Sequence, residues 1–320
     1  MNASIKQKIW YLLKLALSFF VVIFFIAKLD LHTFIKTFTS ARPAFLIGAF
    51  ALTIINIFVG SYRWYILLHA TAANVSFFSV VRMLFIGNFF NLFVPGGIAG
   101  DVIKCVQSSQ ACQSSADAFS SVITDRVIGL VGLVFIALCG IFFQQEFLLK
   151  TGLGKYLISV CLLLLTMSGL LYSRRASRQL CRVFSFTGRM KSYVEPLAKS
   201  LLQYADMPAL FFAAFVLSLT GHLIMIISIY LLALALGAHT SFIYFMLFIP
   251  VIGIISMAPV TIGGIGIRDA GFFLLFPLVG MNKEQAMGTS LLFLAVLILT
   301  SVPGLFLAAF GKPPKQNNPV

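Results

Sequence analysis

Two segments of this chain place glycines, a proline and charged residues inside stretches that are otherwise apolar. The first segment, residues 95–104, contains Pro95, Gly96, Gly97, Gly100, Asp101 and Lys104. The second, residues 259–269, contains Pro259, Gly263, Gly264, Gly266, Arg268 and Asp269. Further polar residues in apolar surroundings are Asn88, Asn91, Asp125 and Arg126. Because a charge inside a bilayer costs roughly 2.5–3.5 kcal/mol, such residues usually mark a function.

The chemistry that these residues could support is the binding of an anion. Arginine forms two parallel hydrogen bonds to a phosphate, and the free N–H groups at the start of a helix also attract negative charge. We therefore expect Lys104, Arg126 and Arg268, with backbone N–H groups at the glycines, to hold an anionic headgroup. The carboxylates that would position these cations or relay protons are Asp101, Asp125 and Asp269. Alternatively, the charges only neutralise one another and lock the helices together.

Composition predicts the class of protein. Hydrophobic residues make up 60% of the 320 residues and charged residues only 10%, and the mean hydropathy is +1.02. Soluble domains carry about 25% charged residues, so this is a polytopic α-helical membrane protein. The net charge of +14 does not indicate nucleic-acid binding, because the basic residues lie in loops between apolar runs. Basic loops instead set the orientation in the membrane and attract anionic headgroups.

Several other kinds of site are not supported by the sequence. The glycine clusters lack the spacing of dinucleotide-binding and P-loop motifs, and the four histidines form no H-E-x-x-H pattern, so we expect no cofactor and no metal. The five cysteines contain no C-x-x-C pair, and we interpret them as small buried hydrophobic residues. A nucleophile with a histidine partner is not visible either.

Six apolar runs are long enough to cross a bilayer, which takes about 20 residues. They are residues 10–28, 44–68, 119–143, 155–172, 208–236 and 286–310. Two further apolar blocks, 77–103 and 242–280, each contain one of the interrupted segments. The first run is longer than the apolar part of a signal peptide and lacks a cleavage signature, so we interpret it as a retained span.

Positive charges predict the orientation of the spans. The tails 1–9 and 311–320 and the basic segment 173–207, which could include a helix on the membrane surface, are expected in the cytoplasm. Block 77–103 must then begin and end on the cytoplasmic side, and block 242–280 on the outer side. Each is expected to be a broken re-entrant helical hairpin, and the two halves of the chain form an inverted repeat. We therefore predict one all-α domain over residues 1–320, with about six full spans and two hairpins that meet near the midplane.

The same segments resemble the signatures of a known family. Residues 87–104 resemble the first signature of the flippase-like membrane domain of lysylphosphatidylglycerol synthases, whose stand-alone relatives form the UPF0104 group. Residues 121–130 are similar to its D-R-x-x-G segment, residues 259–270 to its P-x-x-x-G-G-x-G-x-R-E signature, and Arg63-Trp64 to its early R-W pair. Lys104 stands where an arginine is common and Asp269 where a glutamate is common, and both keep the charge.

The resemblance implies a function in lipid transport. A domain of this kind moves aminoacylated phosphatidylglycerol between leaflets, while a separate soluble domain makes that lipid. Only Gly311 to Val320 follow the last span, so we expect neither the synthase domain nor enzymatic activity. We expect a flippase of the bacterial inner membrane that moves an anionic or aminoacylated (glyco)phospholipid or a polyprenyl phosphate.

Two alternatives remain open at this point. One is a membrane subunit or enzyme component of a lipid-modification pathway, in which Asp101 or Asp125 acts as a general base or holds a metal. The other is a structural partner that holds a lipid-synthesis complex together. The expected partners are membrane lipids with anionic headgroups and, under these alternatives, a lipid-modifying enzyme.

Overall fold

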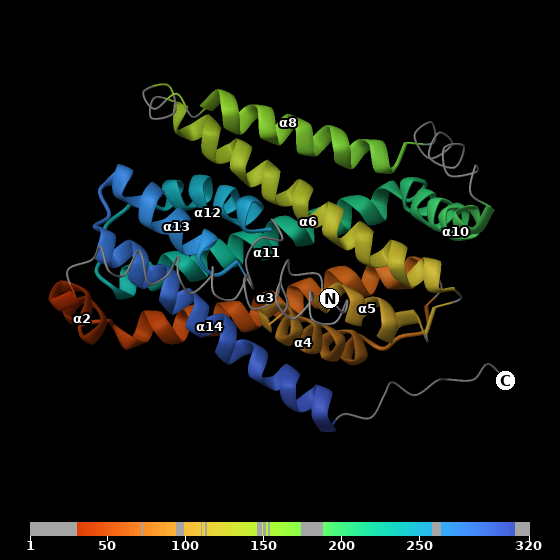
Figure 1. Ribbon diagram of the computed structural model, residues 1–320, viewed down its shortest axis with the longest axis horizontal. Helices are drawn as coiled ribbons and strands as arrows, with labels where there is room; N and C mark the ends of the chain where they lie inside the picture. The colour runs from red at the N-terminus through yellow and green to blue at the C-terminus, as the bar shows by residue number, and fades with distance from the viewer. Residues whose placement is uncertain are drawn as a thin grey trace, which may run out of the picture.

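Four long apolar helices, each long enough to cross a membrane, form the framework of the protein. They are α3 (Pro43–Ala70), α6 (Ser115–Phe143), α11 (Pro208–Ala235) and α14 (Lys283–Phe310). The computed structural model describes residues 31–71, 73–93, 99–109, 111–112, 114–145, 149, 152, 154–173, 188–257 and 264–310, and all regular structure among them is helical (Figure 1). The prediction of an all-α membrane protein is confirmed.

Of the two remaining predicted spans, one corresponds to a shorter apolar helix and the other lies outside the described residues. The run 155–172 corresponds to α8 (Gly154–Leu171), whose apolar part, Leu157–Leu170, is shorter than the four long helices. The run 10–28 lies outside the described residues. The basic segment 173–207 contains α10 (Gly188–Ala205), and α2 (Leu31–Thr39) precedes α3.

Local sequence explains where the long helices begin. Proline occupies the first turn of α3 and of α11, where its missing N–H has no helical partner to lose. Ser114 caps α6, because its side chain accepts a hydrogen bond from the Asp117 N–H at 3.2 Å and donates to the Asp117 carboxylate at 2.8 Å.

Both interrupted segments separate two helices. In the first half, α4 (Phe77–Phe93) is followed by α5 (Ala99–Ser109); in the second, α12 (Phe242–Ser256) is followed by α13 (Ile267–Leu275) and the 3₁₀ helix η1 (Phe276–Val279). The linkers 94–98 and 258–263, and with them Gly96, Gly97 and Gly263, lie outside the described residues. Gly264 and Gly266 have φ values of +73° and +90°, a conformation that glycine adopts without strain.

The helices of the two halves pack against one another rather than separately. Helix α3 lies antiparallel to α11, and the hydroxyls of Thr53 and Ser228 meet across this interface at 3.0 Å. Helix α4 packs on α14 and helix α12 packs on α6. Glycine allows both of the latter contacts: a Cβ at Gly304 would collide with the Phe85 carbonyl oxygen, and one at Gly140 would lie 2.8 Å from the Leu247 Cα.

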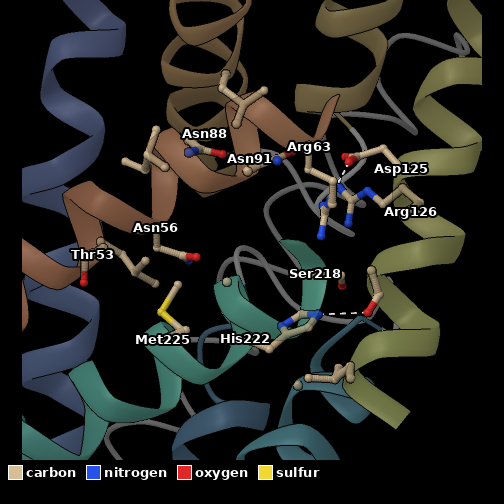
Figure 2. A pocket seen from close by; sticks show the side chains of 18 of the residues that line it. Thr53, Asn56, Arg63, Asn88, Asn91, Asp125, Arg126, Ser218, His222 and Met225 are labelled. Carbon is tan, nitrogen blue, oxygen red and sulfur yellow. Dashed lines mark hydrogen bonds and ion pairs between the residues drawn. The ribbon is translucent and has the colours of Figure 1, made fainter. Parts of the chain in front are cut away.

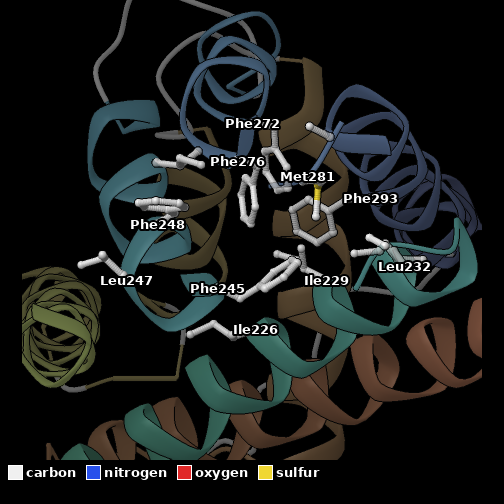
Figure 3. Packing of buried hydrophobic residues seen from close by; sticks show 14 of the residues in the cluster. Ile226, Ile229, Leu232, Phe245, Leu247, Phe248, Phe272, Phe276, Met281 and Phe293 are labelled. Carbon is white, nitrogen blue, oxygen red and sulfur yellow. The ribbon is translucent and has the colours of Figure 1, made fainter. Parts of the chain in front are cut away.

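The largest hydrophobic cluster joins α11, α12, α13, η1 and α14 (Figure 3). Phe276 lies at its centre, with ring centroids 4.7 Å from Phe245, 5.3 Å from Phe248 and 5.0 Å from Phe272. Aromatic pairs at such distances add about 0.5–1.5 kcal/mol each beyond the area they bury. The second interrupted pair is therefore firmly attached to the framework, while the first pair packs on the opposite side of it (Figure 1).

Candidate functional site

A cavity of about 520 Å³ lies between the long helices and the first interrupted pair. Its walls come from α3, α4, α5, α6 and α11, with smaller contributions from α12 and α14 (Figure 2). Charged and amide side chains line one part of it, and leucines line another, among them Leu84, Leu92, Leu130, Leu133 and Leu217. A mixed lining of this kind suits an amphiphilic ligand.

Two ion-pair groups occupy the charged part of the cavity. Asp125 on α6 accepts a hydrogen bond from Arg63 Nε at 2.7 Å and lies 3.5 Å from Lys104 Nζ. Arg126, the next residue of α6, pairs through Nε with Asp101 at 2.7 Å. The Asp125 side chain is buried, whereas the Arg126 side chain is 42% exposed. Helix α6 therefore connects to α3 and α5 through two consecutive charged residues.

The sequence spacing explains how these side chains meet. Asp101 and Lys104 are three residues apart on α5 and so lie on one face of that helix, which is turned toward α6. Trp64, which follows Arg63, donates through Nε1 to Ser121 Oγ at 3.3 Å. The Lys104 ammonium also lies 4.8 Å from the Trp64 ring centroid, a favourable cation–π distance.

The charges that line the cavity do not balance. Arg63, Lys104 and Arg126 are cations, and Asp101 and Asp125 are carboxylates. With His222 neutral, the described residues of the lining carry one surplus positive charge. A low-polarity environment strengthens the attraction of such a charge for an anion.

An uncharged polar region continues from the charged one. Asn91 Oδ1 accepts a hydrogen bond from the Gly100 N–H at 2.7 Å, which satisfies one of the free donors in the first turn of α5. His222 Nε2 lies 2.8 Å from the Gly129 carbonyl oxygen, and because a carbonyl only accepts, Nε2 carries the proton. Asn56 and Asn88 complete this part of the lining.

The polar residues extend deep into the helical bundle. Counting 1.5 Å per residue, Asp125 lies about 15 Å from the start of α6, and His222 lies about 21 Å from the start of α11. Both residues therefore lie several turns inside the ends of helices that are long enough to cross a bilayer core of about 30 Å.

Arg268 and Asp269 form a separate buried cluster rather than part of the cavity lining. The Asp269 carboxylate accepts hydrogen bonds from the Gly266 N–H at 2.8 Å and from the Ser290 hydroxyl, and it lies 3.3 Å from the Arg268 guanidinium. Arg268 also donates to Ser290 at 3.2 Å and lies 5.5 Å from the Phe293 ring. This cluster caps α13 and attaches it to α14.

The structure thus separates the predicted site residues into a group that lines the cavity and a group, mostly around α13, that does not. Those that line the cavity are Asn88, Asn91, Asp101, Lys104, Asp125, Arg126 and Gly264. Gly100 instead packs closely on the Gly87 carbonyl, and Gly266 belongs to the α13 cap. Whether these residues bind a ligand stays a prediction.

Among the cavity residues that sequence reasoning missed are Arg63, Asn56, Ser218 and His222. Arg63 was noted only as part of the R-W pair. The signal that could have found the other three was their polarity in the middle of apolar runs.

Comparison with known proteins identifies the family. The profile described as the lysylphosphatidylglycerol synthase TM region matches residues 11–304. A UPF0104 membrane protein of Pyrococcus horikoshii is 24% identical over 285 residues, which cover 81% of this chain and 84% of that protein. The resemblance found in the sequence is confirmed, and the chain belongs to the family of the lysylphosphatidylglycerol synthase transmembrane region.

Proposed function

We propose that the protein binds the phosphate-bearing headgroup of an anionic lipid in this cavity and moves it across the membrane. The observation that carries the proposal is the surplus positive charge of a cavity that is built from membrane-crossing helices. Family membership adds a connection to lipid handling. The leucine-lined part of the cavity would accept the beginning of the acyl chains while the cations hold the phosphate.

The arrangement of the cations supports binding of a phosphate. Arg63 and Arg126 each use Nε for a carboxylate in this structure, and a guanidinium has further N–H donors for a second acceptor. Arg126 is the most exposed of the paired side chains, so an incoming phosphate would reach it most easily. Each carboxylate in the cavity is already engaged by a cation, which favours a binding role over general-base catalysis.

An inverted repeat would provide the two states that transport requires. In this proposal α3, α4, α5 and α6 correspond to α11, α12, α13 and α14. The packing supports it, because exchanging the two halves converts the contact of α4 with α14 into the contact of α12 with α6. Gly304 and Gly140, which allow these two contacts, would also exchange.

The proposed location is the plasma membrane, with both termini in the cytoplasm. Loop charges support this orientation, because the basic segment 173–207 and the short tails carry many lysines and arginines. The charged part of the cavity would then lie nearer the cytoplasmic side, where α3 ends and α6 begins.

Proteoliposomes provide the test. Purified protein is reconstituted with a trace of phosphatidylglycerol that carries a fluorophore on its acyl chain, and dithionite quenching reports the lipid that reaches the outer leaflet. We expect faster exchange than in empty vesicles, and a loss of roughly tenfold or more in Arg126→Gln and Arg63→Gln, since each loses a charge-assisted hydrogen bond of about 1.5–3 kcal/mol. Arg42→Gln, an exposed residue outside the cavity, is the matched control. Equal rates in empty and protein-containing vesicles would overturn the proposal.

A further inference from the structure

The uncharged polar part of the cavity contains side chains whose hydrogen-bonding capacity is not used. Asn56 on α3 and Asn88 on α4 both line the cavity. Neither carboxamide has a hydrogen-bond partner within the part of the chain that the structure describes. Figure 2 shows both side chains on the side of the cavity opposite Asp125 and Arg126. Each carboxamide offers two N–H donors and one carbonyl acceptor.

A third unused group lines the same cavity. Ser256, in the last turn of α12, lines the cavity, and its buried Oγ has no partner among the described residues. By contrast, the cavity hydroxyls of Thr53, Ser218, Thr300 and Ser301 all donate to main-chain carbonyls. Buried polar groups in folded proteins normally have partners, so the Ser256 hydroxyl is unusual among the described residues. The half-buried carboxamides of Asn56 and Asn88 line the same cavity with donors and acceptors that the polar atoms of a ligand could use.

We infer that the cavity is specific for a phosphodiester lipid whose headgroup is uncharged and bears hydroxyl groups. The inference rests on the proposed function and names the substrate class of the same site. The cations Arg63, Lys104 and Arg126 would hold the single negative charge of the phosphodiester. Asn56, Asn88 and Ser256 would bind the hydroxyls of the headgroup, because a hydroxyl donates and accepts as a carboxamide does.

The charges of the cavity argue against a headgroup that carries an ammonium. Asp101 and Asp125 are the carboxylates of the lining, and both are already paired with cations. An ammonium near Asn56 or Asn88 would therefore add a positive charge to a cavity that already has a surplus of one. Aminoacylated and ethanolamine headgroups are disfavoured for this reason, although both contain a phosphate.

The test compares three short-chain lipids that share the same acyl chains. Dihexanoyl phosphatidylglycerol has a phosphodiester and two hydroxyls, dihexanoyl phosphatidylethanol has the phosphodiester alone, and dihexanoyl phosphatidylethanolamine adds an ammonium. Dissociation constants are measured from the thermal stabilisation of the full chain in detergent, so the result does not depend on transport. We expect phosphatidylglycerol to bind about tenfold more tightly than phosphatidylethanol, as two or three net hydrogen bonds predict, and phosphatidylethanolamine to bind most weakly.

Variants assign the difference to the carboxamides. In Asn56→Ala/Asn88→Ala the affinity for phosphatidylglycerol should fall to that of phosphatidylethanol, while the affinity for phosphatidylethanol stays unchanged. Asn74→Ala, an exposed asparagine outside the cavity, should leave all three affinities as in the wild type.

The outcomes separate this inference from the proposed function. Equal affinity of the wild type for phosphatidylglycerol and phosphatidylethanol, with both above phosphatidylethanolamine, would overturn the hydroxyl site and leave the phosphate site standing. Equal affinity for all three lipids would overturn both. A preference for phosphatidylglycerol that persists in the double variant would show that other residues recognise the hydroxyls, and would refute the assignment to Asn56 and Asn88.

Discussion

Loss of the Asp125 carboxylate provides the sharpest test of the charge arrangement. Asp125 faces two cations at once, Arg63 at 2.7 Å and Lys104 at 3.5 Å, and all three side chains are less than a fifth exposed. Asp125→Asn keeps the shape of the side chain but leaves both cations without their carboxylate. Removing one partner of a buried ion pair costs about 3–5 kcal/mol, because the remaining charge is uncompensated.

The companion variant Asp101→Asn has a much smaller predicted effect. Its partner, Arg126, is 42% exposed, so water and salt can replace the carboxylate, and exposed pairs contribute at most about 1 kcal/mol. Since 1 kcal/mol corresponds to a few degrees in a protein of this size, thermal unfolding in detergent should show a fall on the order of 10 °C for Asp125→Asn and about 2 °C for Asp101→Asn.

Two further measurements test whether the stability lost in Asp125→Asn comes from the uncompensated cations. Arg63→Gln in the Asp125→Asn background should recover part of the lost stability, because it removes one of the two uncompensated cations. Added dihexanoyl phosphatidylglycerol should stabilise Asp125→Asn more than the wild type, since its phosphate can replace the missing carboxylate. An Asp125→Asn protein that unfolds within 2 °C of the wild type, or a double variant less stable than the single one, would refute the reasoning.

Three other predictions follow from the packing and the loops. Gly304→Ala should lower the unfolding temperature strongly, because its Cβ meets the Phe85 carbonyl oxygen, whereas Gly169→Ala, with open space around it, should not; thermal unfolding of both variants checks this. Burial raises the pKa of the Cys112 thiol from 9.0 to about 11, so with the other cysteines replaced its maleimide labelling should increase roughly tenfold per pH unit between pH 8 and 10 instead of levelling near pH 9. Tyr204→Phe should cost about 1 kcal/mol in chemical denaturation, because the buried Tyr204 hydroxyl donates to a main-chain carbonyl of α3 at 3.0 Å.

Local features of the sequence were sufficient to identify most of the charged residues that line the cavity. A charge in an apolar run and a proline with glycines are recognisable without knowledge of the fold, because the membrane makes both costly. They identified Asp101, Lys104, Asp125 and Arg126, and the spacing of Asp101 and Lys104 already placed them on one helix face. The four long helices were predictable for the same reason, since their length and composition are local properties.

The partners of each charge could not be predicted in this way. Asp101 with Lys104 and Arg268 with Asp269 look alike in the sequence, yet the first group faces the cavity and the second is enclosed by Ser290 and Phe293. What decides between the two is the helix that packs against each group, and that depends on contacts between residues far apart in the chain. Arg63 was missed for a related reason, because the sequence alone did not place α3 beside Asp125.

The charged groups of the two interrupted helix pairs differ in how deeply they are buried and in how many partners they have. Around α13, the carboxylate of Asp269 is fully buried and has three partners, and the aromatic cluster attaches η1 to α12. Separating α13 from α14 would therefore break the hydrogen bonds of Arg268 and Asp269 to Ser290 and remove Phe293 from the Arg268 guanidinium. Between α5 and α6, the Lys104–Asp125 pair and the more exposed Asp101–Arg126 pair add to the direct packing of the two helices. In the proposed transport, a phosphate that replaced the Asp101 carboxylate at Arg126 would remove one ion pair between α5 and α6, whereas the Arg268–Asp269 pair is enclosed in the described structure.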